Sequence, residues 1–199
     1  MSVRGTTPLI GTLTAGSEFS LAIRAAAAIF MIALTAVAAQ ISFPIPGTAV
    51  PFTLQPMIVI LTGAVLGARA GAAAQFAYLM LGIAGLPVFA ASPLLPQGAA
   101  RLLGPTGGYL MAYPVAAFIT GLLVERGFGR RFMSALAAML AGVAVIYAGG
   151  LSWLAGAHVA SFSLAVAAGA APFLIADICK AVLAAVMTAT VLPGRISRP

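Results

Sequence analysis

The most distinctive chemical groups in the sequence are an acid and a base three positions apart in an apolar segment, Asp177 and Lys180. In a helix this spacing places both side chains on one face. A charge at the centre of a bilayer costs about 2.5–3.5 kcal/mol on insertion scales, so such residues usually face a cavity and have a function. Two interpretations stay open: a ligand-binding pair beside a cavity, or a structural ion pair that packs its helix against the neighbours.

Three further polar features are candidates for binding. The loop Gly104-Pro105-Thr106-Gly107-Gly108-Tyr109 precedes a predicted helix, where adjacent glycines allow close backbone approach and free N–H groups favour an anion; the alternative is a tight turn with an interfacial tyrosine. Gln55 can hydrogen-bond a ligand or cap backbone groups. Arg101 can attract a carboxylate, although a solvated or snorkelling arginine is the commoner case.

Enzymatic chemistry finds no support in the sequence. The three acids, Glu18, Glu125 and Asp177, are scattered, and no nucleotide-binding motif occurs. Ser152 lacks the sequence context of an intramembrane serine protease. One cysteine and one histidine leave no set of metal ligands. We therefore expect no catalytic residue, no cofactor and no metal site.

The composition places the chain in a membrane. Of its 199 residues 62% are hydrophobic and 7% are charged, whereas a soluble domain carries about 25% charged residues. This excludes a soluble globular protein, and the high hydrophobicity excludes disorder. The net charge of +7 is typical of loop charges that orient a membrane protein, not of nucleic-acid binding. The expected location is the cell (inner) membrane, with multiple spans in the lipid bilayer.

Charge-free runs broken by proline and glycine predict a single transmembrane domain over residues 1–199. It is an all-α bundle of six helices, because a span needs about 20 apolar residues. The predicted helices cover residues 19–40, 54–66, 71–89, 109–124, 132–154 and 171–192. The second is short for a full span. The loops that follow the first, third and fifth helices are long and rich in proline or glycine, which indicates a lid over a pocket.

Basic residues predict the orientation. They precede the first helix, lie in the turns after the second and fourth, and follow the sixth, at Arg4, Arg69, Arg126, Arg130, Arg131, Arg195 and Arg198. The opposite side carries Arg101 alone. The positive-inside rule then places both termini in the cytoplasm and the long loops outside. Small residues repeat every four positions, as at Gly63, Gly67 and Gly71, and on the first helix at Ala22 and Ala26; this predicts helix packing within the chain or, alternatively, docking to another membrane protein.

Four segments together resemble the BioY family, the biotin-binding components of energy-coupling-factor (ECF) transporters. They are Pro51-Phe52-Thr53-Leu54-Gln55, Gly82-Ile83-Ala84-Gly85-Leu86-Pro87-Val88-Phe89, the loop from Gly104 to Tyr109, and Pro172-Phe173 with Asp177 and Lys180. The likeness covers about residues 21–192. Each segment alone is modest, and the four in this order are fairly specific.

The resemblance implies six transmembrane helices, cytoplasmic termini and a biotin pocket near the outer surface. It also implies a membrane coupling protein and two ATPase subunits as partners. The family's ligand contacts fall on Asp177, Lys180 and Tyr109. The family's loop asparagine has no counterpart in this chain, and Thr106 or Gln97 is the expected replacement. With the polar candidates above, the expected biotin site is Asp177, Lys180, Tyr109, Thr106, Gly107, Gln55 and Arg101.

The sequence is also compatible with two other classes of function. An ion- or proton-coupled carrier could use Asp177 and Lys180 as a relay, although relays usually recruit several ionisable groups across a span. A purely structural membrane subunit would bind no small molecule at all.

Overall fold

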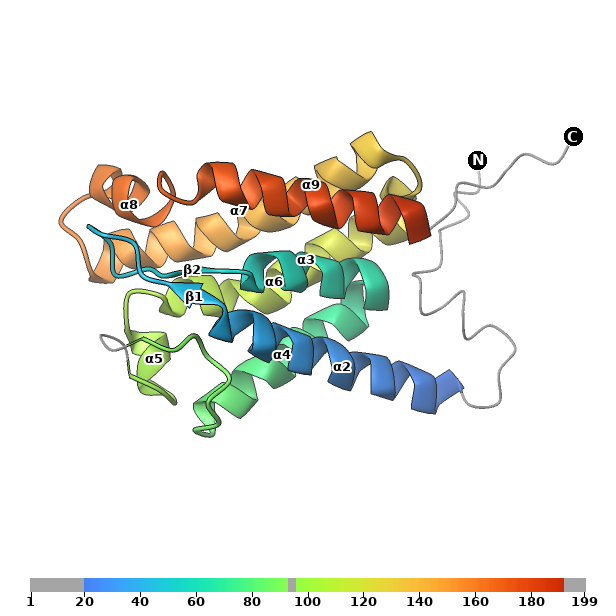
Figure 1. Cartoon of the computed structure of the whole chain (residues 1–199), viewed down its shortest axis with the longest axis horizontal. Helices are drawn as coiled ribbons and strands as arrows, with labels where there is room; N and C mark the ends of the chain where they lie inside the picture. Colours follow the sequence, from blue (N-terminus) through green and yellow to red (C-terminus); the bar gives the residue numbers. More distant parts are fainter. Residues whose placement is uncertain (1–19, 93–95, 192–199) are drawn as a thin grey trace, which may run out of the picture.

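The computed structural model describes residues 20–92 and 96–191, which form a bundle of helices along one long axis (Figure 1). Four helices in these ranges are long and apolar enough to cross a membrane: α2 (Ser20–Gln40), α6 (Gly107–Glu125), α7 (Phe132–Ala157) and α9 (Leu174–Val191). Two shorter helices, α3 (Gln55–Leu66) and α4 (Ala68–Ile83), form a hairpin between α2 and α6. Large apolar side chains such as Ile29 and Phe30 are exposed on the bundle surface, as contact with lipid requires.

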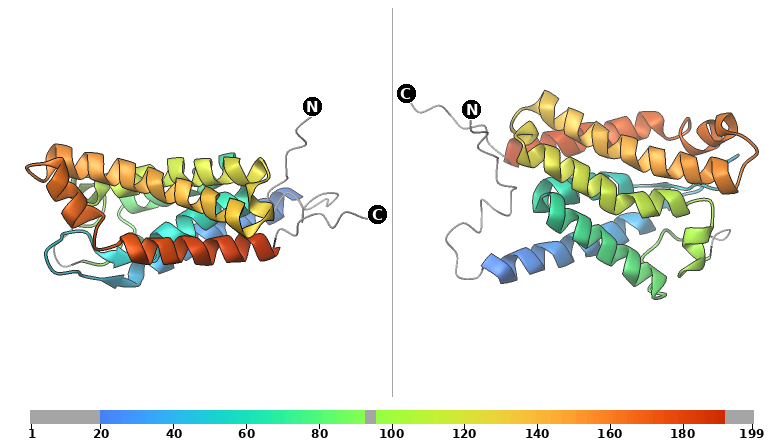
Figure 2. Two further views of the ribbon diagram at one scale, coloured as in Figure 1. Left: turned by 90° about the horizontal axis from the view of Figure 1, so that it is seen from above. Right: turned by 180° about the vertical axis from the view of Figure 1, so that it is seen from behind.

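The two ends of the bundle differ. One end carries the ribbon of β1 (Ser42–Phe43) and β2 (Phe52–Thr53), together with α5 (Ala100–Leu103) and α8 (Phe162–Gly169) (Figure 1). At the other end α2 begins, α3 turns into α4, the 3-10 turn η1 (Phe128–Arg130) joins α6 to α7, and α9 ends (Figures 1 and 2). Arg4, Arg195 and Arg198, used above for orientation, lie outside the described residues.

Several predicted helix boundaries were wrong. In place of the predicted helix over 71–89, the structure has α4, which ends at Ile83. The helix ends there because Gly85 adopts a φ of +96° and the Leu86 N–H bonds back to the Leu81 carbonyl. Such a helix end needs a residue in the left-handed conformation. The range 171–192 begins too early, since residues 171–173 form a turn before α9. The loop expected between 154 and 171 contains the end of α7 and all of α8.

Glycines bring α3, α4 and α6 into backbone contact. A Cβ on Gly63 would lie 2.1 Å from the Ala117 carbonyl oxygen, and one on Gly71 would lie 2.9 Å from the Gly63 Cα. The glycine repeat therefore packs helices within this chain, as small residues do in membrane bundles. Ala22 and Ala26 of α2 do not pack against another helix in this way, because both are exposed.

Gly63→Ala is expected to lower the thermal stability of the detergent-solubilised protein, because the added methyl group meets backbone that cannot move aside. Overpacking of this kind costs about 1–3 kcal/mol. Gly156→Ala is the matched control, since a Cβ on this helical glycine meets nothing within 4 Å. Equal melting temperatures for the two variants would contradict the packing account.

Glutamines attach α2 to the rest of the bundle. The fully buried Gln75 of α4 donates from Nε2 to the hydroxyl oxygens of Thr35 on α2, at 3.1 Å, and Thr62 on α3, at 3.0 Å. At the end of α2, Gln40 donates to the carbonyls of Pro87 and Phe89. Interhelical hydrogen bonds in membranes contribute about 0.6–2 kcal/mol each, which fixes a helix that otherwise has little buried surface.

Candidate functional site

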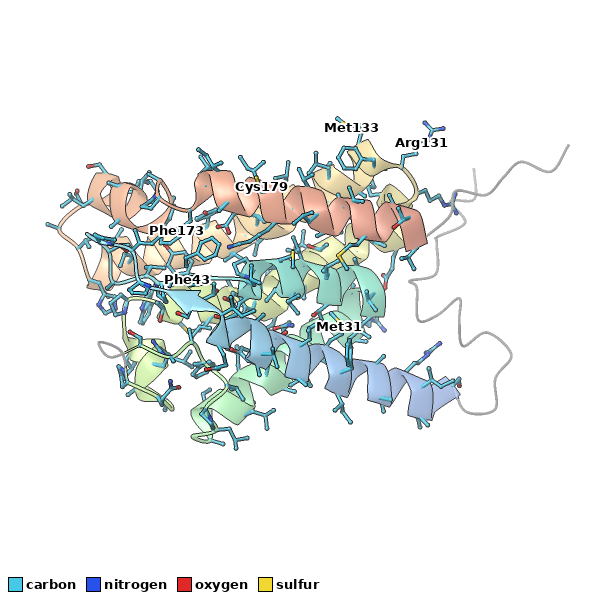
Figure 3. All side chains as sticks on the ribbon, viewed as in Figure 1. Met31, Phe43, Arg131, Met133, Phe173 and Cys179 are labelled. Carbon is cyan, nitrogen blue, oxygen red and sulfur yellow. The ribbon has the colours of Figure 1, made fainter. Side chains whose placement is uncertain are left out.

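A cavity of about 70 Å³ lies at the end of the bundle that carries the ribbon. It receives side chains from both the helices and the connecting segments. Its lining includes Thr53, Gln55, Phe89, Ala90, Arg101, Thr106, Tyr109, Tyr147, Phe173, Asp177 and Lys180. Phe173, in the turn just before α9, points toward the ribbon (Figure 3).

Asp177 and Lys180 both line this cavity, and they also pair with each other. The Lys180 Nζ lies 2.8 Å from Asp177 Oδ1, and both side chains are buried. The two interpretations of the sequence are thus not exclusive, because an ion pair is present and a void lies beside it. An internal pair of this kind is costly to desolvate unless further hydrogen bonds complete it.

Two elements far apart in the sequence supply those further bonds. The Tyr147 hydroxyl on α7 donates to Asp177 Oδ2 at 2.6 Å. Lys180 donates to the Thr53 carbonyl of β2 at 2.6 Å, and its Nζ lies 3.9 Å from the centre of the Phe52 ring. The ammonium group therefore ties the ribbon to α9. Sequence reasoning missed Tyr147; the signal available was a lone tyrosine in the middle of a predicted span.

Arg101 is buried, with 1% of its surface exposed, so the interpretation as a solvated or snorkelling side chain was wrong. It lies on α5, and its guanidinium donates to the Ala90 carbonyl. Its Nε has no hydrogen-bond partner among the described residues. A buried guanidinium with spare donors beside a cavity is arranged to receive an anionic or carbonyl oxygen.

Gln55 and Tyr109 both reach the cavity from the first turns of their helices. Gln55 Nε2 donates to the Tyr78 hydroxyl at 2.7 Å, and Tyr78 donates onward to the Val88 carbonyl at 2.9 Å. The Tyr109 hydroxyl donates to the Gly169 carbonyl at 2.9 Å. These bonds hold the connecting segments against the helices, so each polar group sits in a fixed position beside the cavity.

The loop and helix start before Tyr109 contain one residue that lines the cavity and one that packs against the backbone. Thr106 is buried, lines the cavity, and its hydroxyl has no partner among the described residues. Gly107 does not line the cavity; a Cβ there would lie 1.8 Å from the Leu102 carbonyl oxygen, so this glycine serves a backbone contact. Gln97 is exposed and also lies off the cavity.

Three helices begin at this cavity. The lining includes Gln55 in the first turn of α3, Tyr109 in that of α6 and Asp177 in that of α9. The start of a helix carries a partial positive charge from its unpaired N–H groups. The combined field favours a ligand that has an anionic group.

A bundle of apolar helices around a cavity that holds a charged pair fits a multi-pass membrane transporter component, and comparison with known proteins gives this class. A model of the BioY family matches residues 12–195. A probable biotin transporter BioY of Pyrococcus horikoshii is 43% identical over 157 residues, which cover 78% of this chain and 88% of that protein. The biotin transporter BioY of Thermotoga maritima is 42% identical over 155 residues, covering 78% and 87% respectively.

A known structure agrees with the sequence relatives. The fold matches a crystal structure, at 2.1 Å, of the S-component for biotin from an ECF-type ABC transporter, with a TM-score of 0.76 and 25% identity over 88% of this chain and 93% of that one. The chain belongs to the BioY family. It is thus a transporter component and not an enzyme, which confirms the resemblance drawn from the four sequence segments.

Proposed function

We propose that this chain binds biotin from the outer face of the membrane with high affinity and acts as the substrate-binding component of an ECF-type transporter. The observation that carries the proposal is the Asp177–Lys180 pair, which is buried and lines a cavity instead of lying in a dry contact between helices. The names of its relatives, all biotin transporters, support the same ligand. A membrane coupling protein and ATPase subunits are the partners that this function requires.

The chemistry of biotin fits the polar groups of the cavity. Its ureido group has two N–H donors and one carbonyl acceptor, and its tail ends in a carboxylate. Asp177 accepts a ureido N–H, since each carboxylate oxygen has a second lone pair beyond the bonds from Lys180 and Tyr147. Lys180 donates to an oxygen of the ligand. Arg101, with its spare Nε donor, receives the tail carboxylate.

Thr106, Tyr109 and Gln55 complete the proposed set, and Gly107 supports it through the backbone. Of the two replacements expected for the family's loop asparagine, Thr106 is favoured because it lines the cavity and its hydroxyl has no partner among the described residues, whereas Gln97 is exposed. The cavity of about 70 Å³ is smaller than the ~300 Å³ at which ligand pockets begin. The non-helical lining at Thr53 and at Phe89 therefore moves outward as biotin enters and closes over it.

The orientation belongs to the same proposal. Six crossings with both termini in the cytoplasm place the ribbon end outside. Support comes from α2 beginning and α9 ending at one end of the bundle (Figure 1). The α3–α4 turn and the α6–α7 turn lie at the same end and place Arg69, Arg126 and Arg131 there. The α3–α4 hairpin then counts as two crossings, although both of its helices are short.

The test is whether the full-length protein, purified in detergent, binds radiolabelled biotin. Nanomolar affinity, about −12 kcal/mol, is expected, and excess unlabelled biotin should compete. Absence of binding would leave a structural role. The ion- or proton-coupled carrier is distinguished in vesicles that contain the chain without ATPase subunits, where uptake abolished by an uncoupler would favour the carrier. Against the carrier, the described residues provide no chain of ionisable groups from Asp177 to the opposite end of the bundle.

A further inference from the structure

The turn between α6 and α7 concentrates positive charge at the end of the bundle far from the cavity. Arg126 follows the last residue of α6, Arg130 ends η1 and Arg131 precedes α7. All three are exposed, and within residues 20–92 and 96–191 none of them belongs to an ion pair. The neighbouring carboxylate, Glu125, accepts a hydrogen bond from the Ala68 N–H at the start of α4.

Exposed apolar side chains alternate with these arginines. Phe128 and Phe132 are each 39% exposed, and Met133 is 71% exposed. Arg131 and Met133 both project away from the bundle at its edge (Figure 3). The turn itself is held in place, because η1 packs against α6, α7 and α9. The mixture of guanidinium and apolar groups is thus displayed on a fixed surface.

The position of this turn selects the kind of partner. It joins two helices that are long enough to cross a membrane, so it lies at the boundary between headgroups and acyl chains. There aromatic side chains lie at headgroup level, and arginine stems lie along apolar surface with the charge outward. A guanidinium also matches the geometry of a phosphate, to which it can donate two parallel hydrogen bonds.

We propose that the α6–α7 turn is a binding site for anionic phospholipid headgroups. Arg126, Arg130 and Arg131 hold the phosphate groups, while Phe128 and Met133 enter the upper acyl region. Bound lipid would anchor the ends of α6 and α7, the two helices that supply Tyr109 and Tyr147 to the cavity. The proposal does not depend on biotin binding.

The experiment titrates the full-length protein in detergent micelles with dioleoyl phosphatidylglycerol or dioleoyl phosphatidylcholine and follows the melting temperature. A ligand that binds the folded state raises that temperature. The wild-type protein should be stabilised by phosphatidylglycerol more than by phosphatidylcholine, and added salt should reduce the difference. Arg130→Gln/Arg131→Gln should need roughly 25-fold more phosphatidylglycerol for the same rise, since each arginine near an anionic surface contributes a factor of about five.

The matched control is Arg24→Gln/Arg69→Gln, which removes the same charge from the same end of the bundle but leaves the turn intact. It should respond to phosphatidylglycerol as the wild type does, when the rise of each protein is measured from its own melting temperature without added lipid. An unchanged response of Arg130→Gln/Arg131→Gln would overturn the proposal. So would an equal loss in the control pair, or equal stabilisation by soluble glycerol 3-phosphate, which would mean a general charge effect or a free-phosphate site.

Discussion

Asp177→Asn is expected to weaken biotin binding by at least ~10-fold while the protein remains inserted in the membrane. The substitution keeps the size of the side chain and removes its charge, so Lys180 loses its ionic partner and the ureido N–H loses a charged acceptor. Removing one partner of a buried, hydrogen-bonded charge pair costs about 2–5 kcal/mol. Equilibrium binding of radiolabelled biotin to the purified variant measures the effect.

Glu125→Gln is the control for this variant, because Glu125 lies at the opposite end of the bundle, where it bonds to the Ala68 N–H. It should bind biotin as the wild type does, even if its stability falls. An Asp177→Asn protein with wild-type affinity would remove Asp177 from the binding site and leave the ion pair as a packing feature.

Arg101→Gln is expected to weaken biotin binding by about 30-fold or more and to abolish the preference for biotin over its methyl ester. The wild-type guanidinium is buried with an unused Nε donor beside the cavity, and it donates best to a charged carboxylate. Loss of a buried charged contact of at least 2 kcal/mol corresponds to this factor. Competition experiments with biotin and with its methyl ester, on the wild type and on Arg101→Gln, give the four affinities that this comparison needs.

The ester comparison separates recognition from packing. Arg101 also donates to the Ala90 carbonyl, so its replacement can loosen that segment and weaken every ligand equally. If Arg101→Gln lowers the affinity for biotin and for the ester by the same factor, then Arg101 is a packing residue and the carboxylate binds elsewhere. Arg69→Gln, on the exposed start of α4, serves as the control for loss of a positive charge.

The sequence predicted the long helices and the charged pair because their signals are local. An apolar run of span length has few other structures available, and an acid–base pair within it is costly unless it has a role. The ends of the helices were predicted less well. The end of α4 depends on Gly85, whose positive φ is one of several that a glycine can adopt. The helix α8 lies in a segment too short for a span, so hydropathy gave no reason to expect it.

The site could be predicted in part for the same reason. Asp177 and Lys180 stand out in the sequence, whereas the burial of Arg101 depends on how α5 and the segment at Ala90 pack on the bundle, which is a tertiary property. Tyr147 meets Asp177 from a helix 30 residues earlier, and no local pattern encodes that meeting. Thr106 and Gln97 were the two candidates to replace the family's loop asparagine, and the exposure of each side chain in the structure was needed to choose between them.

The convergence of the starts of α3, α6 and α9 on one cavity sets a limit on redesign. Their contribution to the electric potential comes from main-chain amides, which side-chain substitution leaves in place. Retargeting this scaffold to a cationic vitamin would therefore require acidic groups added beside Gln55 and Tyr109, in excess of the charge that Asp177 already provides. Changing the specificity from one carboxylated ligand to another needs no added acidic groups and is therefore the easier aim for protein engineering.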